Sequence, residues 1–482
     1  MNRRRYFVIL FFFSLAAGAQ APSAATSAGS ATSASAPSAS ATSPRYVVGL
    51  GEYQCFIINT ATGKLYGISN NLTTAGVGWD AGIAGLPMLV GGRKDLSFTY
   101  VASGMHNSLA VDVHGDVWTW GSNASGESGT GSVDDLGPAP VKIVADSLGN
   151  PFTGVVQVVC WATDACNGNL AVKSDGTVWI WGLTREGMRG NGQVGHLNTR
   201  PVQVKIPMGK KIVKVVAGMV VIALASDGTV WTWGGNNRKE LLGTNTVDYT
   251  HPHQLPLPQR AKDIAGGGYF SYALGVNGVL YGWGYYTSYM GIGKGGWMLQ
   301  EPPPAAPRDL SGELNLPHPV ASIVTNSVST HVILTDGTLW GWGDNSSGCV
   351  GNGQELDFAH HKPPYTWDWG PGQLLVQKPV HLAVGVHNFI RVFGGSSAVF
   401  YSYAETAGGQ LYSWGRNKGS VLGNGIVAPS PDILAVYPNS WDVATVTAVD
   451  PFALTTNKIV TSPYCLLHPD GNPCNQYKVP SK

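Results

Sequence analysis

Charged side chains are scarce in this sequence. They make up 12% of the 482 residues, and acidic and basic side chains nearly balance, so that the formal net charge is +1. Nucleic-acid binding draws much of its affinity from clustered lysine and arginine, which neutralise phosphates. The balance of charges here offers no long-range attractive field, and no basic stripe is present that would attract a membrane surface. We therefore expect neither a nucleic acid nor a membrane surface as partner.

The short motifs of several enzyme classes are absent as well. The sequence has no Gly-x-Ser-x-Gly elbow, no phosphate-binding loop ending in Lys-Ser or Lys-Thr, and no His-Glu-x-x-His motif. Isolated acids remain at Glu127, Glu186, Glu240 and Glu405, and two of them close in space would suit glycoside cleavage. The sequence alone brings no two of them together. Catalysis is therefore left open, a structural role for these acids is favoured, and no cofactor is expected.

Cysteine is also infrequent, with six residues in the chain. Their spacing does not form paired Cys-x-x-Cys motifs and no histidine cluster accompanies them, so we expect no metal site. An even number of cysteines in an exported chain makes disulfides plausible. Two pairs are close enough in sequence for local bridges, Cys160 with Cys166 and Cys465 with Cys474. The full connectivity stays open.

An apolar run near the amino end is too short to span a membrane comfortably. It extends from Phe7 to Leu15, follows three arginines and precedes small residues around Ala19. This order is typical of a cleaved secretory signal, here residues 1–21, whereas a single membrane anchor would need a longer run. Residues 22–44 are almost entirely Ala, Ser, Thr, Gly and Pro, which predicts a flexible linker. We expect a secreted, periplasmic or cell-surface protein whose folded part is 45–482.

Glycine and aromatic residues, by contrast, recur in a fixed order. Seven times a Gly-rich turn precedes a short aromatic strand that ends in glycine, and the best copy is Asp227-Gly228-Thr229-Val230-Trp231-Thr232-Trp233-Gly234. The first copy is truncated and ends at Gly67; the other six close at Gly121, Gly182, Gly234, Gly284, Gly343 and Gly415. The copies follow one another at roughly 50 to 70 residues, a period typical of repeat folds.

Each repeat is expected to contain a β-hairpin. The apolar run from Val221 to Ala225 meets Asp227-Gly228, which suits a tight turn, and a β-branched and aromatic run follows. Trp231 and Trp233 lie two residues apart and share one face of the second strand, so both faces of the hairpin carry apolar side chains. Radial stacking of blades buries both faces. We therefore predict an all-β fold, a seven-bladed β-propeller.

The same residues resemble the repeat of the regulator of chromosome condensation family. The resemblance recurs from residue 46 to 425, and its best copy is carried by Val216-Ala217-Gly218, Ala223-Leu224, the strand ending at Gly234, Asn237 and Leu242-Gly243. It implies the same seven-bladed propeller. Glu127 and Glu240 fall near a site where that family's repeat usually has glutamine, which favours a structural role for both acids.

One further motif of that family is present only once. Gly104-Met105-His106 is similar to the Gly-x-His that the family often places before the second apolar strand. The corresponding places in other repeats hold residues such as Val220 and Phe270. The resemblance therefore implies the fold, and not a shared ring of functional histidines.

The two ends of the folded part are expected to meet. Val443 to Val449 and Lys458 to Leu467 both have the composition of strands. Closing a ring by pairing one end of the chain with the other would put them in the blade that begins at Tyr46 to Gly49. An eighth partial blade around Cys465 to Gly471 is the lesser alternative, because this segment lacks the Trp-Gly strand.

The repeated aromatic and amide side chains are expected to be structural. Six tryptophans lie on the strand that defines the repeat, which indicates core positions between blades: Trp118, Trp120, Trp179, Trp181, Trp231 and Trp233. Four asparagines recur just after that strand and are expected to form turns that bind local backbone groups: Asn123, Asn237, Asn345 and Asn417.

Residues that interrupt the repeat are the better candidates for binding, since repeat folds carry function in insertions. The longest interval contains aromatic rings with a carboxylate and imidazoles: His360, His361, Tyr365, Trp367, Asp368 and Trp369. Such a set is suited to stacking on and hydrogen bonding to a sugar or a peptide. A second aromatic segment contains Tyr285, Tyr286, Tyr289 and Trp297. The alternative for both segments is packing on the side of the ring.

Three functions are compatible with these features. The favoured one is a secreted, monomeric scaffold that binds an unidentified protein or glycan. A carbohydrate-active enzyme, a glycoside hydrolase or lyase on a propeller, is the first alternative. Guanine-nucleotide exchange on a small GTPase is the second, implied only by the family resemblance, and the export signal and the missing histidines count against it.

Overall fold

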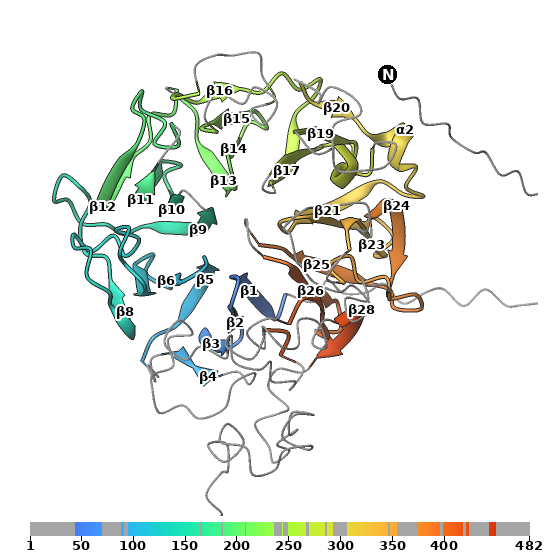
Figure 1. Cartoon of the computed structure of the whole chain (residues 1–482), viewed down its shortest axis with the longest axis horizontal. Coiled ribbons are helices and arrows are strands. Elements are labelled where there is room, and N and C mark those ends of the chain that lie inside the picture. The colour runs from blue at the N-terminus through green and yellow to red at the C-terminus, as the bar shows by residue number, and fades with distance from the viewer. Residues whose placement is uncertain are drawn as a thin grey trace, which may run out of the picture. The chain divides into compact units, whose positions relative to one another are not determined.

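Antiparallel β-strands form almost all of the described structure. The computed structural model describes residues 44–69, 88–90, 95–163, 166–184, 187–207, 209–235, 243, 249–266, 269–284, 287–292, 306–345, 348–353, 375–395, 399–417, 421–423 and 443–449. The chain divides into two units, Met1–Ala41 and Thr42–Lys482, and every described residue lies in the second. Its seven four-stranded sheets are arranged in a ring (Figure 1), which confirms the seven-bladed propeller. No helix in the described ranges is long and apolar enough to cross a membrane.

Every blade is built from one continuous stretch of chain, with its first strand innermost. In order from blade 1 to blade 7 the strands are β1 (Tyr46–Leu50), β2 (Gln54–Asn59), β3 (Lys64–Ser69), β4 (Met88–Leu89); β5 (Phe98–Ser103), β6 (Asn107–Asp112), β7 (Val117–Gly121), β8 (Gly137–Lys142); β9 (Val155–Thr163), β10 (Cys166–Lys173), β11 (Val178–Thr184), β12 (His196–Gln203); β13 (Ile212–Ala217), β14 (Val221–Ala225), β15 (Val230–Trp233), β16 (His253–Gln254); β17 (Ala261–Gly266), β18 (Phe270–Gly275), β19 (Leu280–Gly284), β20 (Arg308–Asp309); β21 (Val320–Thr325), β22 (Ser329–Leu334), β23 (Leu339–Asp344), β24 (Leu375–Leu382); β25 (Phe389–Phe393), β26 (Tyr401–Thr406), β27 (Leu411–Gly415), β28 (Val443–Val449). Two short helical turns, η2 (Thr287–Met290) and α2 (Ser311–Leu314), lie between β19 and β21.

The repeated motif forms the hairpin between the second and third strands of each blade, as predicted. In blade 4, Val221 pairs with Trp233 and Leu224 with Val230. The turn residue Gly228 has φ +81°, a region that favours glycine. The N–H of Ala261, at the start of the next blade, donates a hydrogen bond of 2.9 Å to the Gly228 carbonyl. The turn therefore shapes the hairpin and also links neighbouring blades.

That link between blades recurs around the ring. The first inner-strand N–H of blades 2 to 7 donates to the turn glycine of the blade before it; besides the pair in blades 4 and 5, the pairs are Phe98 to Gly63, Val155 to Gly115, Ile212 to Gly176, Val320 to Gly278 and Phe389 to Gly337. All six turn glycines have a positive φ, and their carbonyls accept a hydrogen bond from the next blade. The glycine repeat therefore marks contacts between blades as well as local turns.

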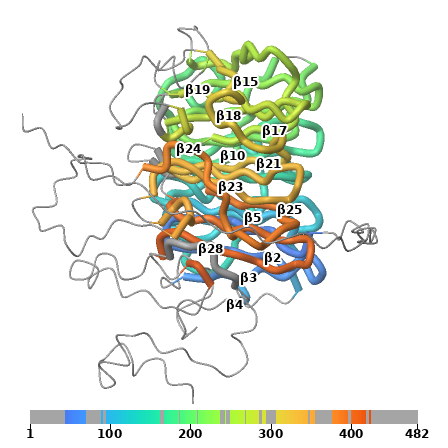
Figure 2. Tube along the Cα trace, turned by 90° about the vertical axis from the view of Figure 1, so that its right-hand side faces the viewer, coloured from blue at the N-terminus to red at the C-terminus, as the bar shows by residue number. Residues whose placement is uncertain are grey.

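The alternating strand direction creates two different faces of the ring (Figure 2). Turns between first and second strands, and connections between third and fourth strands, lie on one face, which we name the loop face. The glycine turns and the connections to the next blade lie on the other, which we name the turn face. The strands β19 and β23, which precede the two segments that interrupt the repeat, are third strands and end on the loop face.

The repeated tryptophans pack between blades. Trp120, Trp179, Trp181, Trp231 and Trp233 are buried, as predicted, whereas Trp118 is only partly buried. Several indole N–H groups also donate to a carbonyl of the preceding blade; the pairs are Trp181 to Glu127 and Trp233 to Met188, both at 2.8 Å, and Trp414 to Cys349 at 3.1 Å. These aromatic side chains therefore combine apolar burial with a directed contact between blades.

The predicted asparagine turns are confirmed at three positions. The side-chain oxygens of Asn123, Asn345 and Asn417 each accept a hydrogen bond from the N–H five residues later, at 2.8, 2.8 and 3.1 Å. All three side chains are buried. Asn237 lies outside the described residues.

The ring closes differently from our expectation. Val443–Val449 pairs with β27 as the outer strand of blade 7, and β1 pairs with β2 as the inner strand of blade 1, so the described ends of the chain do not share a sheet. The physical reason is that each blade already has four strands from its own stretch of chain. The segment from Lys458 to Leu467 lies outside the described residues.

Side-chain contacts between blades 7 and 1 replace strand pairing. The hydroxyl of buried Tyr401 lies 2.9 Å from both the Gly51 and the Gln54 carbonyls. Arg391 donates to the Tyr46 carbonyl at 2.7 Å. Apolar side chains of both blades, among them Leu50, form one core cluster. The ring is thus closed by packing and hydrogen bonds.

The predicted bridge between Cys160 and Cys166 is wrong. Cys160 is a free, buried cysteine, and burial raises the pKa of its thiol. In the pairing of β9 with β10, Cys166 lies opposite Thr163 and Cys160 opposite Asn169. Three residue pairs along a strand amount to about 10 Å, which is beyond the reach of a disulfide. Cys465 and Cys474 lie outside the described residues.

Candidate functional site

Most of the residues predicted to bind a ligand lie outside the described residues. This holds for His360, His361, Tyr365, Trp367, Asp368, Trp369, Tyr285, Tyr286 and Trp297. Tyr289 is described and is buried at 5% exposure in the core between blades 5 and 6. Its ring packs edge-on against Phe270, with centroids 6.1 Å apart. Tyr289 therefore lies in the packing of the ring and is not at its surface.

The isolated acids do not form a catalytic pair among the described residues. The Glu127 carboxylate accepts a hydrogen bond of 2.7 Å from the Ser125 N–H, beside the contact between blades 2 and 3. Glu405 accepts one of 2.6 Å from the Arg45 N–H, where blades 7 and 1 meet. Burial raises the pKa of both carboxyls. The Glu405 carboxylate therefore serves the contact between blades 7 and 1, whereas the Glu127 carboxylate binds within its own blade. Glu186 and Glu240 lie outside the described residues.

A group of large side chains surrounds the loop-face end of the ring. Four members directly precede a second strand, and the fifth, Met219, lies two residues before β14; in blades 1, 2, 4, 5 and 7 they are Tyr53, His106, Met219, Tyr269 and Phe400. His106 is exposed and the other four are partly buried. The rings of Tyr53 and His106 stack across blades 1 and 2, with centroids 5.7 Å apart and planes 9° apart. We name these five residues the aromatic rim.

Strand pairing corrects the expectation that His106 and Phe270 occupy corresponding places in their repeats. Asn107 and Phe270 lie opposite the closing glycines Gly121 and Gly284, so Asn107 and not His106 corresponds to Phe270. His106 instead corresponds to Tyr269, one residue earlier. In the sequence, the rim position can be located by counting back from the closing glycine across the hairpin, whereas a Gly-x-His motif marks it only at His106.

The closing glycines allow the rim residues to sit close to the strand ends. Gly121 has φ +97°, and a Cβ atom there would lie 2.3 Å from the His106 carbonyl oxygen. Gly284 is similar, because its Cβ would lie 2.5 Å from the Tyr269 carbonyl oxygen. Any other residue would clash with the backbone carbonyl of the rim residue. The glycine in the repeat therefore positions the rim.

A buried polar network that spans blades 1 to 3 supports the rim residues Tyr53 and His106. The Gln54 amide donates to Ser103 Oγ at 2.8 Å, and the Asn107 amide donates to Asn169 Oδ1 at 3.1 Å. Asn169 in turn donates to the Glu127 carbonyl at 2.6 Å. These bonds join side chains of neighbouring blades directly beneath Tyr53 and His106. Buried hydrogen bonds of this kind make a surface more rigid, although Gln54 Oε1 is buried without a hydrogen-bond partner among the described residues.

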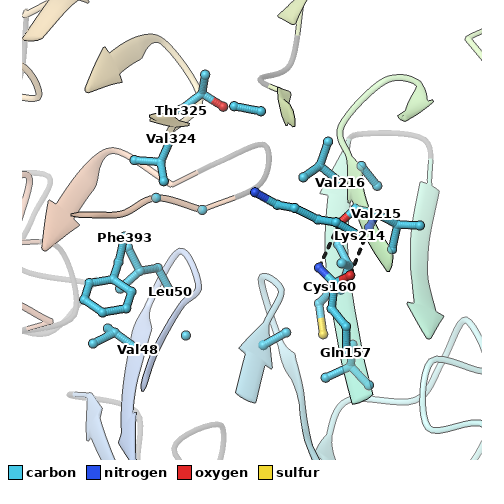
Figure 3. Close-up of a pocket in the computed structure, with 18 of the residues that line it drawn as sticks. Val48, Leu50, Gln157, Cys160, Lys214, Val215, Val216, Val324, Thr325 and Phe393 are labelled. Atoms are coloured by element: carbon cyan, nitrogen blue, oxygen red, sulfur yellow. Dashed lines mark hydrogen bonds between the residues drawn. The ribbon is translucent and has the colours of Figure 1, made fainter. Parts of the chain in front are cut away.

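A cavity of about 280 Å³ lies along the axis of the ring, lined by all seven inner strands. Lys214 extends from β13 toward its middle, and Gln157 is held by two hydrogen bonds of 2.9 Å to the Val215 backbone (Figure 3). Tyr100 and Arg391 line the same cavity. Asp263 of the neighbouring inner strand β17 lies 2.5 Å from Lys214 Nζ and balances its charge.

A bulge near the start of six inner strands sets the direction of these polar side chains. In blades 2, 4 and 7 the pairing with the second strand skips Thr99, Val213 and Ile390. A bulge bends its strand and re-aims the following side chain. The following residues in these blades are Tyr100, Lys214 and Arg391, which all line the cavity. No local feature of the sequence indicates this convergence.

Groups of metal-ligating side chains are absent from the part of the chain that the structure describes: no three His, Cys, Asp or Glu residues there are placed to hold a metal ion.

Comparisons with known proteins agree with this geometry. The sequence model of the Regulator of chromosome condensation (RCC1) repeat matches residues 227–274, which contain the best copy of the motif. In solved structures, Prp20p from Saccharomyces cerevisiae superposes with a TM-score of 0.60 and 23% identity, over 85% of this chain and 88% of Prp20p. This chain therefore has the fold of the yeast RCC1 structures and contains a match to the RCC1 repeat. The yeast RCC1 (Prp20) bound to Kap60 gives a TM-score of 0.59 at 22% identity, over 86% of each chain.

The curated proteins to which this chain is similar are of different kinds. They include the human E3 ubiquitin-protein ligase HERC2, 28% identical over 63% of this chain and 6% of HERC2, and the Ultraviolet-B receptor UVR8 of Arabidopsis thaliana, 26% identical over 56% of this chain and 58% of UVR8. Protein pim1 of Schizosaccharomyces pombe is 27% identical over 67% of this chain and 59% of pim1. This chain thus spans less than two thirds of each of these relatives.

Proposed function

We propose that this protein is an exported scaffold that binds a partner protein on its loop face. The observation that carries the proposal is the aromatic rim, which surrounds the ring axis on the face where β19 and β23, the strands before the two inserted segments, end. Tyrosine, phenylalanine and methionine are enriched at protein interfaces, where a few large side chains supply most of the binding energy. Export rests on the leader-like residues 1–21.

The rigidity of the loop face supports this proposal. Stacked Tyr53 and His106 stand on the buried network of Gln54, Asn107 and Asn169. Arg416 places its guanidinium 5.9 Å from the centre of the Phe400 ring, which adds a cationic group beside an aromatic one. A surface that is already ordered loses little conformational entropy when a partner binds.

Proteins of the same fold bind other proteins. Prp20p has binding properties toward Gsp1p and histones, and the yeast RCC1 (Prp20) structure is a complex with Kap60. These partners belong to the yeast proteins and are not assigned to this chain. The likeness supports the class of partner proposed here, namely a protein, and leaves its identity to experiment.

Partner capture with matched variants tests the proposal. The chain from Arg45 onward is immobilised, incubated with envelope extract, and the captured protein is purified and titrated back to measure stoichiometry. We expect a defined complex that is lost in the triple variant Tyr53→Ala, His106→Ala and Tyr269→Ala. The control changes three exposed turn-face residues, Val113→Ala, Val276→Ala and Val384→Ala, and should keep the complex.

Two outcomes would contradict the proposal. If the variant with three turn-face changes loses the complex and the variant with three loop-face changes keeps it, the interface lies on the turn face. Binding on a glycan array in the absence of any captured protein would replace the protein partner with a glycan. The variant Tyr365→Ala, Trp367→Ala and Trp369→Ala then tests whether the longer inserted segment contributes to the same interface.

A further inference from the structure

We propose that the axial cavity binds a short extended peptide with small side chains, whose backbone pairs with the edges of the inner strands. This inference goes beyond the proposed function and does not depend on it, because the cavity and the aromatic rim are different parts of the ring. Three observations carry it: a strand edge that a side-chain amide already occupies, equivalent edges in the other blades, and the dimensions of the cavity.

The side-chain amide of Gln157 occupies the backbone edge of β13. Its nitrogen donates to the Val215 carbonyl and its oxygen accepts the Val215 N–H, both at 2.9 Å (Figure 3). A neighbouring β-strand makes the same pair of bonds with a residue at a sheet edge. Val215 lies opposite Ala223 of β14 and lines the cavity. Its N–H and C=O therefore point away from β14, at an edge that accepts a peptide-like partner.

Every other inner strand has an equivalent edge residue. In blades 2, 3, 5, 6 and 7 it is the second residue after the bulge, and in blade 1 it is the matching residue of a strand without a bulge; these residues are Val101, Val158, Ile264, Ile323, Val392 and Val48. All of them line the cavity. Because backbone groups alternate in direction along a strand, the shared register gives all of them the outward direction of Val215.

Two further hydrogen bonds agree with this direction. The Ile264 N–H donates to the Asp263 carboxylate at 2.8 Å. In blade 1 the carbonyl of Tyr46, two residues before Val48 and so on the same edge, accepts a hydrogen bond of 2.7 Å from Arg391. Side chains from the cavity wall therefore bind inner-strand edges at three places.

The remaining edges have no such side-chain partner among the described residues; they are those of Val48, Val101, Val158, Ile323 and Val392. Unpaired strand edges bind further extended chains, and several peptide-binding domains use this property. Pairing of backbone with backbone requires no net charge. It therefore fits a cavity in which Asp263 balances the charge of Lys214.

The dimensions of the cavity favour a short and narrow chain. Four inner strands line it with four consecutive residues each, which are 47–50, 100–103, 157–160 and 214–217. Such a stretch of strand extends over about 13 Å, so a peptide beside it would contribute about four residues. The volume of about 280 Å³ lies at the lower end of the range for small-molecule sites. The side chains of the peptide must therefore be small.

The two ends of the cavity differ in the size of their side chains. The turn-face end carries large ones, among them Tyr100, Lys214 and Arg391. At the loop-face end the lining residues of blades 2 to 7 are mostly small: Ser103, Cys160, Ala217, Gly266, Thr325 and Gly395. We therefore expect the peptide to enter from the loop face and to end near Lys214.

Calorimetric titration of the full chain with the neutral peptide acetyl-Gly-Ala-Gly-Ala-amide tests the proposal. We expect saturable binding of one peptide per chain. A peptide of the same sequence whose two central nitrogens are methylated should bind roughly tenfold more weakly, because it cannot donate hydrogen bonds to the inner-strand carbonyls. Amide hydrogen exchange gives a second readout. The bound peptide should slow exchange in β5, β9 and β25 and leave the outer strands β12 and β24 unchanged.

Two substitutions of Lys214 separate the filling of the cavity from the loss of a charge. Lys214 extends toward the middle of the cavity (Figure 3), so Lys214→Trp places a large ring there and should abolish binding. Lys214→Met removes the charge from a side chain of similar length and should bind the peptide as the unchanged chain does. Melting curves confirm that both variants are folded.

Several results would overturn the proposal. They are an absence of saturable heat, equal affinity for the methylated peptide, equal slowing of exchange in inner and outer strands, and loss of binding in Lys214→Met, which would show that charge holds the ligand. The same four residues are also presented as the tail of a carrier protein: binding of the tail assigns the site to protein tails, and binding of the free peptide alone assigns it to short peptides. Partner capture reads out the aromatic rim, so either inference can fail while the other stands.

Discussion

At the scale of single residues, stability is most sensitive to tightly packed positions, where neither a larger side chain nor a new charge can be accommodated. Glycine at the hairpin turns is the clearest case, because it combines a positive φ with a contact to the next blade. His331 is a second case, since it is completely buried between blades 6 and 7 among Trp414, Val350 and Ser402. Each leads to a prediction that a single substitution can check.

Replacing Gly228 with valine should destabilise the protein strongly. A β-branched residue resists φ +81°, and the new Cβ would lie 2.7 Å from the Arg260 Cβ, so we expect a loss of at least about 3 kcal/mol in the free energy of unfolding. Urea denaturation measures it. The control is Gly149→Val, at φ +86° with open space around the Cβ, which should cost only about 1 to 2 kcal/mol. Equal costs would show that the contact with blade 5 is unimportant.

Acid should destabilise the protein through His331. Burial lowers the pKa of this histidine from 6.5 to about 4. Between these values the unfolded chain binds a proton that the folded chain does not, so the free energy of unfolding falls as the pH falls through this window. From pH 7 to pH 4.5 the contribution of this group is a loss of about 2 kcal/mol.

The measurement for His331 is urea denaturation of the unchanged chain and of His331→Asn at both pH values. The variant should lose about 2 kcal/mol less on acidification than the unchanged chain. Exposed His387→Asn serves as the control and should follow the unchanged chain. Identical pH dependence in the His331 variant and the unchanged chain would refute the prediction.

At the scale of elements, the hairpin motif is a small hydrogen-bonded unit. In blade 4 Asp227 accepts from the Thr229 N–H and hydroxyl at 3.0 and 2.7 Å, and Thr229 Oγ1 accepts from the Trp231 indole at 3.1 Å. Blades 3 and 6 repeat these bonds through Asp175 and Asp336. Lys210, through its hydrogen bond, holds the pKa of Asp227 well below its usual range. The order Asp-Gly-Thr-x-Trp is thus explained by the bonds inside one turn.

The tryptophan that ends this hairpin should contribute in two separable ways. Trp233→Ala removes a fully buried ring and should cost about 3 to 5 kcal/mol. Trp233→Phe keeps an aromatic ring but leaves the Met188 carbonyl without its donor, and we expect a smaller loss of about 1 to 3 kcal/mol. Chemical denaturation of both variants measures the difference. An alanine variant as stable as the unchanged chain would remove this residue from the core.

At the scale of the whole molecule, the propeller is a ring of complete blades. Contacts between neighbours are made by turn carbonyls, indole groups and apolar packing, and the same kinds of contact join blade 7 to blade 1. Tyr401 is the central residue there, because its hydroxyl reaches two carbonyls of blade 1. Ring closure therefore depends on a few side chains far apart in the sequence.

Removing the Tyr401 hydroxyl should loosen the closure. Tyr401→Phe leaves the Gly51 and Gln54 carbonyls without this donor, and we expect a loss of about 1 to 3 kcal/mol together with faster amide exchange in β2. The control is Tyr272→Phe, whose hydroxyl contacts the Thr330 hydroxyl between blades 5 and 6 at 3.0 Å and should leave β2 exchange unchanged. Equal protection of β2 in both variants would contradict this role.

The repeat by itself determined the class of fold, the number of blades and the hairpin in each. These features follow from turn chemistry and side-chain alternation, which act over a few residues and are visible in any one copy such as Asp227 to Gly234. Burial of Trp181 and Trp233 was predictable for the same reason. The candidate aromatic segments around Tyr285 and Trp367 remain predictions.

Only the tertiary structure decided the rest, because it depends on distances between residues that are remote in sequence. Strand register put Cys160 too far from Cys166 and made His106 the equivalent of Tyr269. Because each blade has four strands from its own stretch of chain, β1 and β28 lie in different sheets. The bulges of different inner strands brought Tyr100, Lys214 and Arg391 to one cavity. In a ring each blade meets two neighbours, so such convergence arises from the closure of the ring and not from any local pattern.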